Sequence, residues 1–496
     1  MIGYYVRLYN TQNPPDVVWD EVHFGNFTNG YIKGEYFFDI HPPFAKLQFA
    51  FWDWLQEYNG SIMFEGYDRG YKDENFISLR ITPIMYSSLV PCMIYVAMRS
   101  ALFSKIAAFT SGFLISIETS MIAEGKFLFT DGTLHFYTMF SMIFINLFLS
   151  KHTRTKEWWR WMKISSFFMG LAFSIKNTAL SLIFLTAYTQ IVEIIIFRNF
   201  DFDIDLYAEV CSRIWYSLWP GLLIHFAIWA YHFTVLPYGT EDVFDSDWES
   251  YSLIDRKRDN ETAFIQFVHW PPLTLRVLDV ISSTFISNGL NFEPHDSMSR
   301  PFDWPLLLDK WIMYYPRWQG DFVCCGNLFV YVMTFSGVIL SMLGFWSKKQ
   351  FPYALRFIVG YWVSYLPFYG VPRTMFLYHY HVPLMFASCC LGCALDLWLP
   401  KYWKGFACVF IIFAGLVGYF IINPFIYGNG RVNREWRLLN KSWRDGKPGR
   451  HKYYDYMASK ASSQKKAYHE NDPNYTDPTP ESGRRGRGRA RRRARS

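Results

Sequence analysis

The sequence has little of what would make this chain an ordinary soluble protein. Charged residues make up only 18% of its 496 residues, whereas 51% are hydrophobic and 20% are aromatic. Mean hydropathy is nevertheless near zero, at +0.02, so long apolar stretches must alternate with polar loops. This composition is typical of a polytopic membrane protein.

The chain also lacks a basic surface outside its C-terminus. Its formal net charge is +7, and residues 481–496 alone carry eight arginines and one glutamate, which accounts for the whole excess. A nucleic-acid-binding function would depend on these terminal residues alone, so we expect no nucleic-acid partner. Residues 426–496 form a polar tail, which we expect to be disordered from about Ser462.

The eight cysteines predict neither a disulfide framework nor a metal cluster, because most of them lie inside apolar runs. These are Cys92, Cys389, Cys390, Cys393 and Cys408. Cys390 and Cys393 have the spacing of a redox pair, but in an apolar helix we interpret them as packing residues.

The N-terminus lacks both a signal peptide and room for a membrane span. Ile2 to Val6 is apolar, but Arg7 follows, and a span needs about 20 apolar residues. A charged region and a cleavage site are missing as well. We therefore expect a first span to be truncated or absent.

Ten apolar spans are predicted, the fourth and fifth of which could form one broken or paired hairpin. They are residues 79–99, 104–123, 127–150, 164–182, 183–197, 213–236, 322–345, 353–370, 376–397 and 404–425. If residues 1–78 are exterior, the alternate loops are cytoplasmic, and each of those contains Lys or Arg, as the positive-inside rule requires. The five N-x-S/T sequons then all fall outside: Asn26, Asn59, Asn260, Asn440 and Asn474.

Acidic side chains and histidines are concentrated in one exterior stretch near the N-terminus. Asp20, Glu21, His23, Asp39 and His41 lie within 22 residues. Partial desolvation at a membrane boundary raises the pKa of a carboxylate and makes it a better base. The two prolines after His41 fix the backbone there. A metal site built from these side chains is chemically possible, but their spacing fits no established ligand pattern.

A helix from Lys46 to Tyr58 follows this stretch. It has Leu47, Phe51, Trp54 and Leu55 on one face, which predicts an amphipathic helix lying on the membrane surface, with a soluble core helix as the alternative.

Several charged or polar residues lie near or inside the predicted spans, where they are costly unless they face a cavity or a partner. Arg80 opens the first span, Lys176 lies within the fourth, and Asp131 follows a short exterior turn after Glu124 and Lys126. A further group is Arg373, Tyr378, His379 and Tyr380, beside Pro367 and Pro372. Arg373 and His379 could donate hydrogen bonds to phosphate oxygens, whereas the tyrosines alone would suit an interfacial aromatic belt.

Val17 to Gly25 and Gly34 to Phe44 together resemble the first lumenal loop of the protein O-mannosyltransferases, membrane glycosyltransferases of the GT-C architecture. Segments around Arg80, Lys126 to Asp131, Gly170 to Lys176, His295 to Leu306 and Arg373 to Tyr380 are similar to the family's in the same order. The family's usual arginine is replaced by Lys126, which loses bidentate phosphate binding. Its MIR domain is also missing, since residues 237–321 are too short to hold one.

The resemblance implies a GT-C-like, all-α bundle of about ten transmembrane helices in the endoplasmic reticulum membrane, with a lumenal active site. The expected division is a lumenal loop with the acidic motif and interfacial helix (1–78), an N-terminal bundle (79–236), a large lumenal loop (237–321), a C-terminal bundle (322–425) and the polar tail (426–496).

The resemblance also implies an activity, in which mannose passes from dolichyl phosphate mannose to Ser or Thr hydroxyls of proteins with inversion. Asp20 would be the base, and Glu21 would orient the acceptor or share its proton. Arg80, Lys176, Arg373 and His379 would bind the donor phosphate, and Asp131 would close the sugar site. Tyr380 would also contact the donor, and Asp39 and His41 would shape the site. No cofactor is implied with certainty, although a divalent cation is compatible, and a homo- or heterodimer with a family member is expected.

Two other functions compete with this hypothesis. The chain could be an inactive paralogue that serves as a dimer partner, although the intact acidic pair argues against this. It could also be a proton-coupled secondary transporter, but such proteins usually place their carboxylates near mid-membrane and show internal repeats, and neither feature is evident here.

Overall fold

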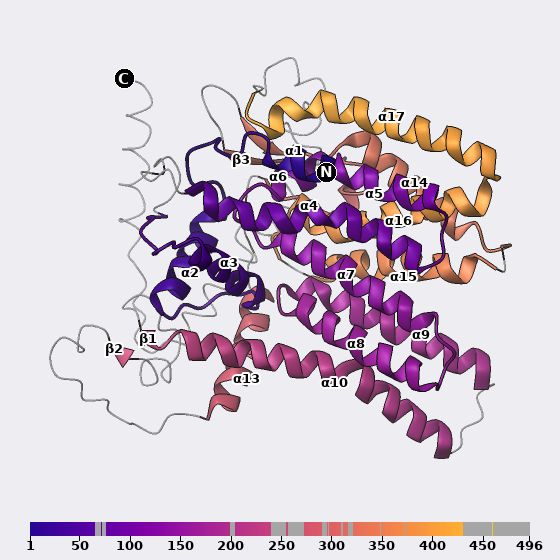
Figure 1. Cartoon of the computed structure of the whole chain (residues 1–496), viewed down its shortest axis with the longest axis horizontal. Coiled ribbons are helices and arrows are strands. Elements are labelled where there is room, and N and C mark those ends of the chain that lie inside the picture. The colour runs from indigo at the N-terminus through magenta and orange to yellow at the C-terminus, as the bar shows by residue number, and fades with distance from the viewer. Residues whose placement is uncertain are drawn as a thin grey trace.

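The chain folds into a bundle of helices (Figure 1). This computed structural model describes residues 1–64, 71, 76–198, 204–239, 254–255, 272–289, 295, 297–308, 311–315, 321–347, 349–371, 373–429 and 459. Three predicted sequons, Asn260, Asn440 and Asn474, lie outside these residues, as do most of the large loop and of the polar tail.

The α-helices are α1 (Ile2–Leu8), α2 (Glu21–Lys33), α3 (Phe44–Leu55), α4 (Phe76–Ser100), α5 (Lys105–Ser116), α6 (Thr119–Glu124), α7 (Asp131–Leu149), α8 (Lys156–Phe173), α9 (Leu180–Arg198), α10 (Ile204–Val235), α13 (Leu273–Gly289), α14 (Leu328–Met342), α15 (Phe351–Tyr365), α16 (His381–Trp398) and α17 (Lys401–Ile426). Short 3₁₀ turns are η1 (Asn177–Ala179), η2 (Pro301–Asp303), η3 (Leu366–Tyr369) and η4 (Leu377–Tyr380).

Six stretches of the described chain are helical, long and apolar enough to cross a membrane. They are α4, α7, Asn177–Ile195, α10, Leu377–Trp398 and α17, and the shorter helices α5 and α14 are also apolar. The polytopic, all-α class is therefore confirmed, while the number of ten spans stays a prediction. The predicted span 104–123 is wrong as a single helix, because α5 ends at Ser116 and the buried carboxylate of Glu118 caps α6 by accepting from the backbone N–H groups of Ser120 and Met121.

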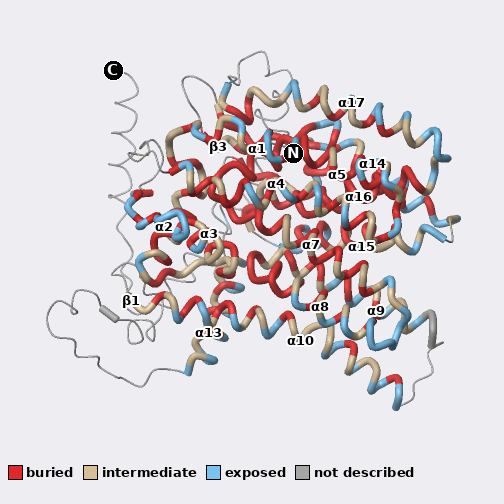
Figure 2. The backbone as a smooth tube through the Cα atoms, in the orientation of Figure 1, coloured by how far each residue is buried: buried red, intermediate tan, exposed pale blue. Residues whose placement is uncertain are grey.

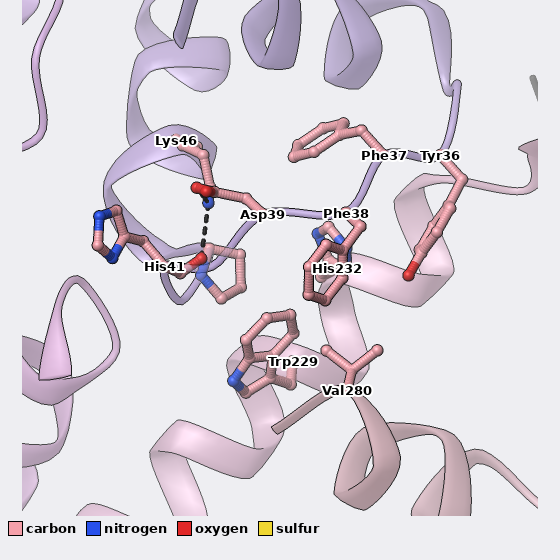
Figure 3. Close-up of a pocket in the computed structure, with 10 residues that line it drawn as sticks. Tyr36, Phe37, Phe38, Asp39, His41, Lys46, Trp229, His232 and Val280 are labelled. Carbon is pink, nitrogen blue, oxygen red and sulfur yellow. Dashed lines mark hydrogen bonds and ion pairs between the residues drawn. The ribbon is translucent and has the colours of Figure 1, made fainter. Parts of the chain in front are cut away.

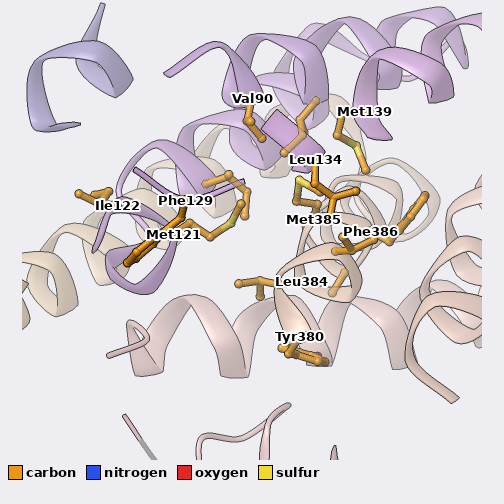
Figure 4. Close-up of a cluster of buried hydrophobic side chains, with 14 of the residues drawn as sticks. Val90, Met121, Ile122, Phe129, Leu134, Met139, Tyr380, Leu384, Met385 and Phe386 are labelled. Atoms are coloured by element: carbon orange, nitrogen blue, oxygen red, sulfur yellow. The ribbon is translucent and has the colours of Figure 1, made fainter. Parts of the chain in front are cut away.

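The most buried part of the bundle lies where α4, α5, α7 and α16 meet (Figure 2). Almost every side chain of α16 is buried. Figure 4 shows part of this apolar core, in which Val90 of α4, Leu134 of α7 and Met385 of α16 converge. In contrast, α17 lies along one edge and exposes a row of aromatic side chains, including Phe406, Phe410 and Phe413, as a lipid-facing helix would.

Helices α2 and α3 pack beside the bundle at one end, where backbone hydrogen bonds fasten them (Figure 1). Helix α2 ends at Gly34, whose φ of 72° suits a residue without a side chain. The chain then bonds to the segment just beyond α10, where Tyr36 N–H donates to the Tyr238 carbonyl at 2.7 Å. At the start of α3, Phe44 N–H donates to the Ser174 carbonyl at 2.9 Å. The acidic loop is therefore attached directly to the segment that carries Lys176.

Helix α3 has the amphipathic character that we predicted, although it begins two residues earlier and ends sooner. Phe51, Trp54 and Leu55 are exposed, with 63% of Trp54 accessible. Asp53, on the same helix, is fully buried. Its position on the membrane surface stays a prediction.

Two small sheets are the exceptions to an all-helical chain among the described residues. Strand β1 (Tyr238–Gly239) pairs in parallel with β2 (Ile254–Asp255), and β3 (Ile312–Tyr315) pairs antiparallel with β4 (Phe322–Cys324). Strand β3 brings Tyr314, from the end of the large loop, against α6 and the turn before α7. The predicted boundary at residue 322 therefore falls in β4, and the C-terminal bundle begins with α14.

Candidate active site

Glu21 and Arg80 form a buried ion pair whose hydrogen-bonding capacity is used within the protein. Arg80 Nε donates to Glu21 Oε1 at 2.8 Å and Nη2 donates to Oε2 at 2.7 Å. The remaining donors of Arg80 reach the backbone carbonyls of Thr11, Pro14 and Asp16. All five N–H groups of the guanidinium are thus engaged. Arg80 has no donor left for a phosphate, so the role that we predicted for it does not fit this geometry.

The carboxylate of Glu21 is equally occupied. Besides Arg80, it accepts hydrogen bonds from the backbone N–H groups of Val18 and Leu128 and from the hydroxyl of Tyr71. Its side chain is fully buried. Glu21 is therefore not placed to orient an acceptor or to share its proton, as we had predicted, and instead ties the acidic loop to α4 and to the turn before α7.

Asp20 is in a different environment, although it is the neighbouring residue. It precedes the first residue of α2, and its side chain does not cap that helix. Burial raises the pKa of the Asp20 carboxyl to about 6, while the positive charges of His23 and Lys176 oppose this rise and the negative charges of Asp131 and Asp39 add to it. A carboxylate with this pKa is deprotonated at neutral pH and is a strong enough base to take a proton from a hydroxyl.

Trp19 fixes the backbone that presents Asp20. Its φ is 47°, in the left-handed region that a bulky residue rarely adopts. Its ring lies within 6 Å, between ring centroids, of His295, Tyr314 and Phe376. Such a conformation is strained and persists where surrounding contacts enforce it, which is common at functional sites. The sequence contained the tryptophan but gave no signal of this aromatic enclosure.

Asp131 and Lys176 form a second buried ion pair beside Asp20. The two distances from Lys176 Nζ to the Asp131 carboxylate oxygens are 2.9 and 3.0 Å, and Nζ also lies 5.2 Å from the ring centroid of Tyr378. Glu124 hydrogen-bonds with Asp131 and accepts from the hydroxyl of Tyr314. A chain of contacts thus runs from the end of the large loop to Lys176.

Asp39 and His41 lie beside Lys46, as Figure 3 shows. Lys46 forms an ion pair with Asp39 and donates to the His41 carbonyl at 2.7 Å. These residues lie in a narrow crevice that is walled by aromatic rings, including Trp229 and His232. Burial, and next the charges of Lys176 and Arg373, keep the pKa of the His41 imidazole well below its usual range. His41 is therefore neutral and belongs to the same electrostatic cluster as Asp20.

Arg373 and Tyr378 complete this cluster. The pKa of the Arg373 guanidinium, lowered by burial, is partly restored by the nearby Tyr378 and Asp20. His379 accepts a hydrogen bond from the Phe376 N–H at Nδ1, over 3.1 Å, and its ring stacks parallel to Trp304. The structure thus brings together Asp20, Asp39, His41, Asp131, Lys176, Arg373 and His379.

Tyr380 does not join them. It is fully buried, its hydroxyl is 3.1 Å from that of Tyr361, and its ring packs against Tyr331 and Tyr365. Residues in a 3₁₀ turn point about 120° apart, so Tyr378 faces Lys176 while Tyr380 faces the C-terminal bundle. The surroundings of Tyr380 do not fit the donor-binding role that we predicted for it, whereas Tyr378 lies beside Lys176.

Metal binding has no evident centre in the part of the chain that the structure describes. There, no group of three or more His, Cys, Asp or Glu side chains is arranged to hold an ion. The acidic groups nearest to one another, Asp131 and Glu124, are engaged by Lys176 and Tyr314. A divalent cation stays an untested prediction.

Comparison with known proteins identifies first the class of protein that shares this fold and then the family. The fold matches that of a membrane-embedded glycosyltransferase, in the structure titled as the Saccharomyces cerevisiae protein O-mannosyltransferase Pmt1-Pmt2 complex bound to the sugar donor. The TM-score is 0.75 at 15% identity, over 86% of this chain and 89% of that one.

Family models match residues 1–241, as dolichyl-phosphate-mannose-protein mannosyltransferase, and 281–445, as the C-terminal four-span region of protein O-mannosyltransferase. The chain therefore belongs to the protein O-mannosyltransferase family, as its motifs predicted.

Two curated relatives illustrate how far the likeness extends. The chain is 34% identical over 184 residues to dolichyl-phosphate-mannose–protein mannosyltransferase 4 of Schizosaccharomyces pombe, a match covering 36% of this chain and 23% of the relative. It is 30% identical over 227 residues to mannosyltransferase 3 of Saccharomyces cerevisiae, covering 45% and 30% respectively. The matched regions thus span less than a third of the length of these relatives.

Proposed function

We propose that the chain is a protein O-mannosyltransferase, which transfers mannose from dolichyl phosphate mannose to Ser or Thr hydroxyls of proteins. The names of the relatives, and the sugar donor bound in the solved Pmt1-Pmt2 complex, support this donor class. The observation that carries the proposal is the position of Asp20, a half-buried carboxylate with a pKa of about 6, within the electrostatic reach of Lys176 and Arg373. A base beside two cations is what transfer from a sugar phosphate requires.

In the proposed reaction the acceptor oxygen attacks carbon 1 of the mannose. The bond between carbon 1 and the phosphate oxygen breaks, and dolichyl phosphate leaves with the electron pair. Asp20 takes the hydroxyl proton, while Lys176 and Arg373 stabilise the charge that develops on the phosphate. A single displacement of this kind inverts the anomeric configuration, and it requires one base but no carboxylate nucleophile.

We further propose that the site faces the lumen of the endoplasmic reticulum and that the chain pairs with another family member. Asn26 and Asn59, the two described sequon asparagines, are both exposed, which favours a lumenal position for this loop. The solved homologue is a complex of two proteins, Pmt1 and Pmt2. Glycosidase treatment of the native protein, with Asn26→Gln and Asn59→Gln as controls, tests this orientation.

The test of the activity is transfer of mannose from dolichyl phosphate mannose to a Ser/Thr-rich peptide. Membranes carrying the full chain with a partner are compared with Asp20→Asn and with Glu57→Gln, a matched acid-to-amide change at an exposed residue. Asp20→Asn should lower turnover by roughly 10²- to 10⁴-fold, whereas Glu57→Gln should not. Equal turnover in wild type and Asp20→Asn overturns the assignment of the base. Transfer that is carried by the partner alone would identify the chain as an inactive companion.

A further inference from the structure

Unsatisfied polar groups are concentrated immediately after Lys176. The side-chain oxygen and nitrogen of Asn177, the hydroxyl of Thr178 and the hydroxyl of Ser181 are all buried, and none has a hydrogen-bond partner. These four atoms fall within five residues, which no other run of described residues matches. Leaving such a group unpaired in the interior is unfavourable. A cluster of them therefore calls for an explanation.

The same pattern appears on both sides of Asp131, the ion-pair partner of Lys176. The hydroxyls of Thr130 and Thr133 are buried and unpaired too, as is His41 Nδ1. The Asp131–Lys176 pair joins the two segments at 2.9 Å. The unpaired polar atoms therefore lie in the segments that carry Lys176 and Asp131, and in the acidic loop next to them.

The chemistry of these atoms indicates which ligand they suit. The amide of Asn177 offers one acceptor and two donors, and each hydroxyl offers both functions. A phosphate has only acceptors to offer, and a lipid chain has neither donors nor acceptors. A sugar ring presents hydroxyls that both donate and accept, so it alone among the parts of the donor can satisfy the whole set.

The location agrees with this choice. If Lys176 holds the phosphate, the residues that follow it in the chain lie next to the group attached to that phosphate. Asp131 fixes the orientation of Lys176, and Asp20 must reach the acceptor hydroxyl that attacks carbon 1 of the same sugar.

We propose that Asn177, Thr178 and Ser181 bind the hydroxyls of the donor sugar and so determine which hexose the protein transfers. This inference rests on the proposed function and adds the residues that select the sugar. A site built to bond hydroxyls discriminates strongly against a sugar that leaves its groups unpaired.

The experiment uses the full chain with its partner and two donors, dolichyl phosphate mannose and dolichyl phosphate glucose, which differ in configuration at carbon 2 of the sugar. The variants are Asn177→Leu, Thr178→Val and Ser181→Ala. The control is Thr189→Val on the same helix, because the Thr189 hydroxyl already donates to the Thr186 carbonyl at 2.8 Å. Donor KM, kcat and melting temperature are measured for each.

We expect Asn177→Leu and Thr178→Val to lower kcat/KM for the mannose donor roughly tenfold each and to reduce the preference for mannose over glucose, with the fold intact. Thr189→Val should change neither. Melting temperatures that rise while donor kinetics and preference stay unchanged would mean that only water occupies these groups, which overturns the inference. If the wild-type protein transfers sugar from neither donor, the proposed function itself is wrong. If the wild type is active and the variants behave like it, only the assignment of Asn177, Thr178 and Ser181 is wrong.

Discussion

Asp20 and Glu21 are consecutive residues with opposite surroundings. Glu21 is enclosed by Arg80, Tyr71 and two backbone N–H groups, whereas Asp20 is half-buried among charges that it does not neutralise. A carboxylate whose hydrogen bonds are satisfied within the protein stabilises the fold, while one that is left partly unsatisfied can take part in chemistry. Adjacent residues at a helix start point in different directions, which is how one dipeptide can serve both purposes.

The largest expected effect on stability comes from breaking the ion pair between Glu21 and Arg80. Glu21→Gln or Arg80→Met should lower the free energy of unfolding by about 3–5 kcal/mol, because each change leaves an uncompensated charge buried. Thermal unfolding in detergent measures the stability of these variants and of Asp20→Asn. Asp20→Asn should stay folded and lose turnover, so a fully stable Glu21→Gln protein would contradict the division of roles.

Asp53 sharpens the comparison, because it is as buried as Glu21 but has no partner for either carboxylate oxygen. Burial raises its pKa to about 7. The folded state therefore holds this proton more tightly than the unfolded state, and stability falls as pH rises from about 4 to 7. The difference corresponds to roughly 4 kcal/mol above pH 7.

Asp53→Asn should accordingly raise the melting temperature at pH 8 and change it little at pH 4. Glu57→Gln, at an exposed position just beyond the end of α3, should show no such dependence on pH. An equal shift for Asp53→Asn at both pH values would mean that the carboxylate is already satisfied.

The pH dependence of turnover tests the unsatisfied member. Asp20 must be deprotonated to act as a base, so kcat/KM for the acceptor should fall about tenfold for each pH unit below 6 and level off above it. Initial rates between pH 4.5 and 8 give this profile, and Glu57→Gln should reproduce it. A flat profile between pH 5 and 7 would exclude a base with this pKa.

The smallest effect is expected at Tyr380. Tyr380→Phe removes one hydroxyl contact with Tyr361 and should cost about 0.5–1.5 kcal/mol of stability without changing donor KM. Tyr378→Leu, which removes the ring that lies over Lys176, is the variant to compare with it and should raise donor KM. The reverse result would restore the original prediction for Tyr380.

Much of the fold could be predicted because the lengths of the apolar stretches and the charges of the loops between them can be read directly from the sequence. The motif around Asp20 likewise indicated a candidate site, and the structure places Lys176, Asp131, Arg373 and His379 near it. The sequence could not show in which direction each side chain points. Nothing local distinguishes Tyr378 from Tyr380. Nothing local shows, either, that Arg80 uses all its donors on Glu21 and three backbone carbonyls. Such facts arise from contacts between residues far apart in the chain. Glu118 was missed for a similar reason, since an acid inside an apolar run reads as part of a span until its capping hydrogen bonds are known.

The hydrogen bond from Phe44 to Ser174 joins the exposed aromatic helix α3 to the segment that carries Lys176. If α3 rests on the bilayer and Lys176 binds the donor as we propose, a change in the height of the lipid surface would reach Lys176 through this hydrogen bond. Bilayer thickness would then set the alignment of the two substrates, one anchored in lipid and the other arriving from water. The rate of transfer would then depend on how deeply α3 sits in the membrane surface.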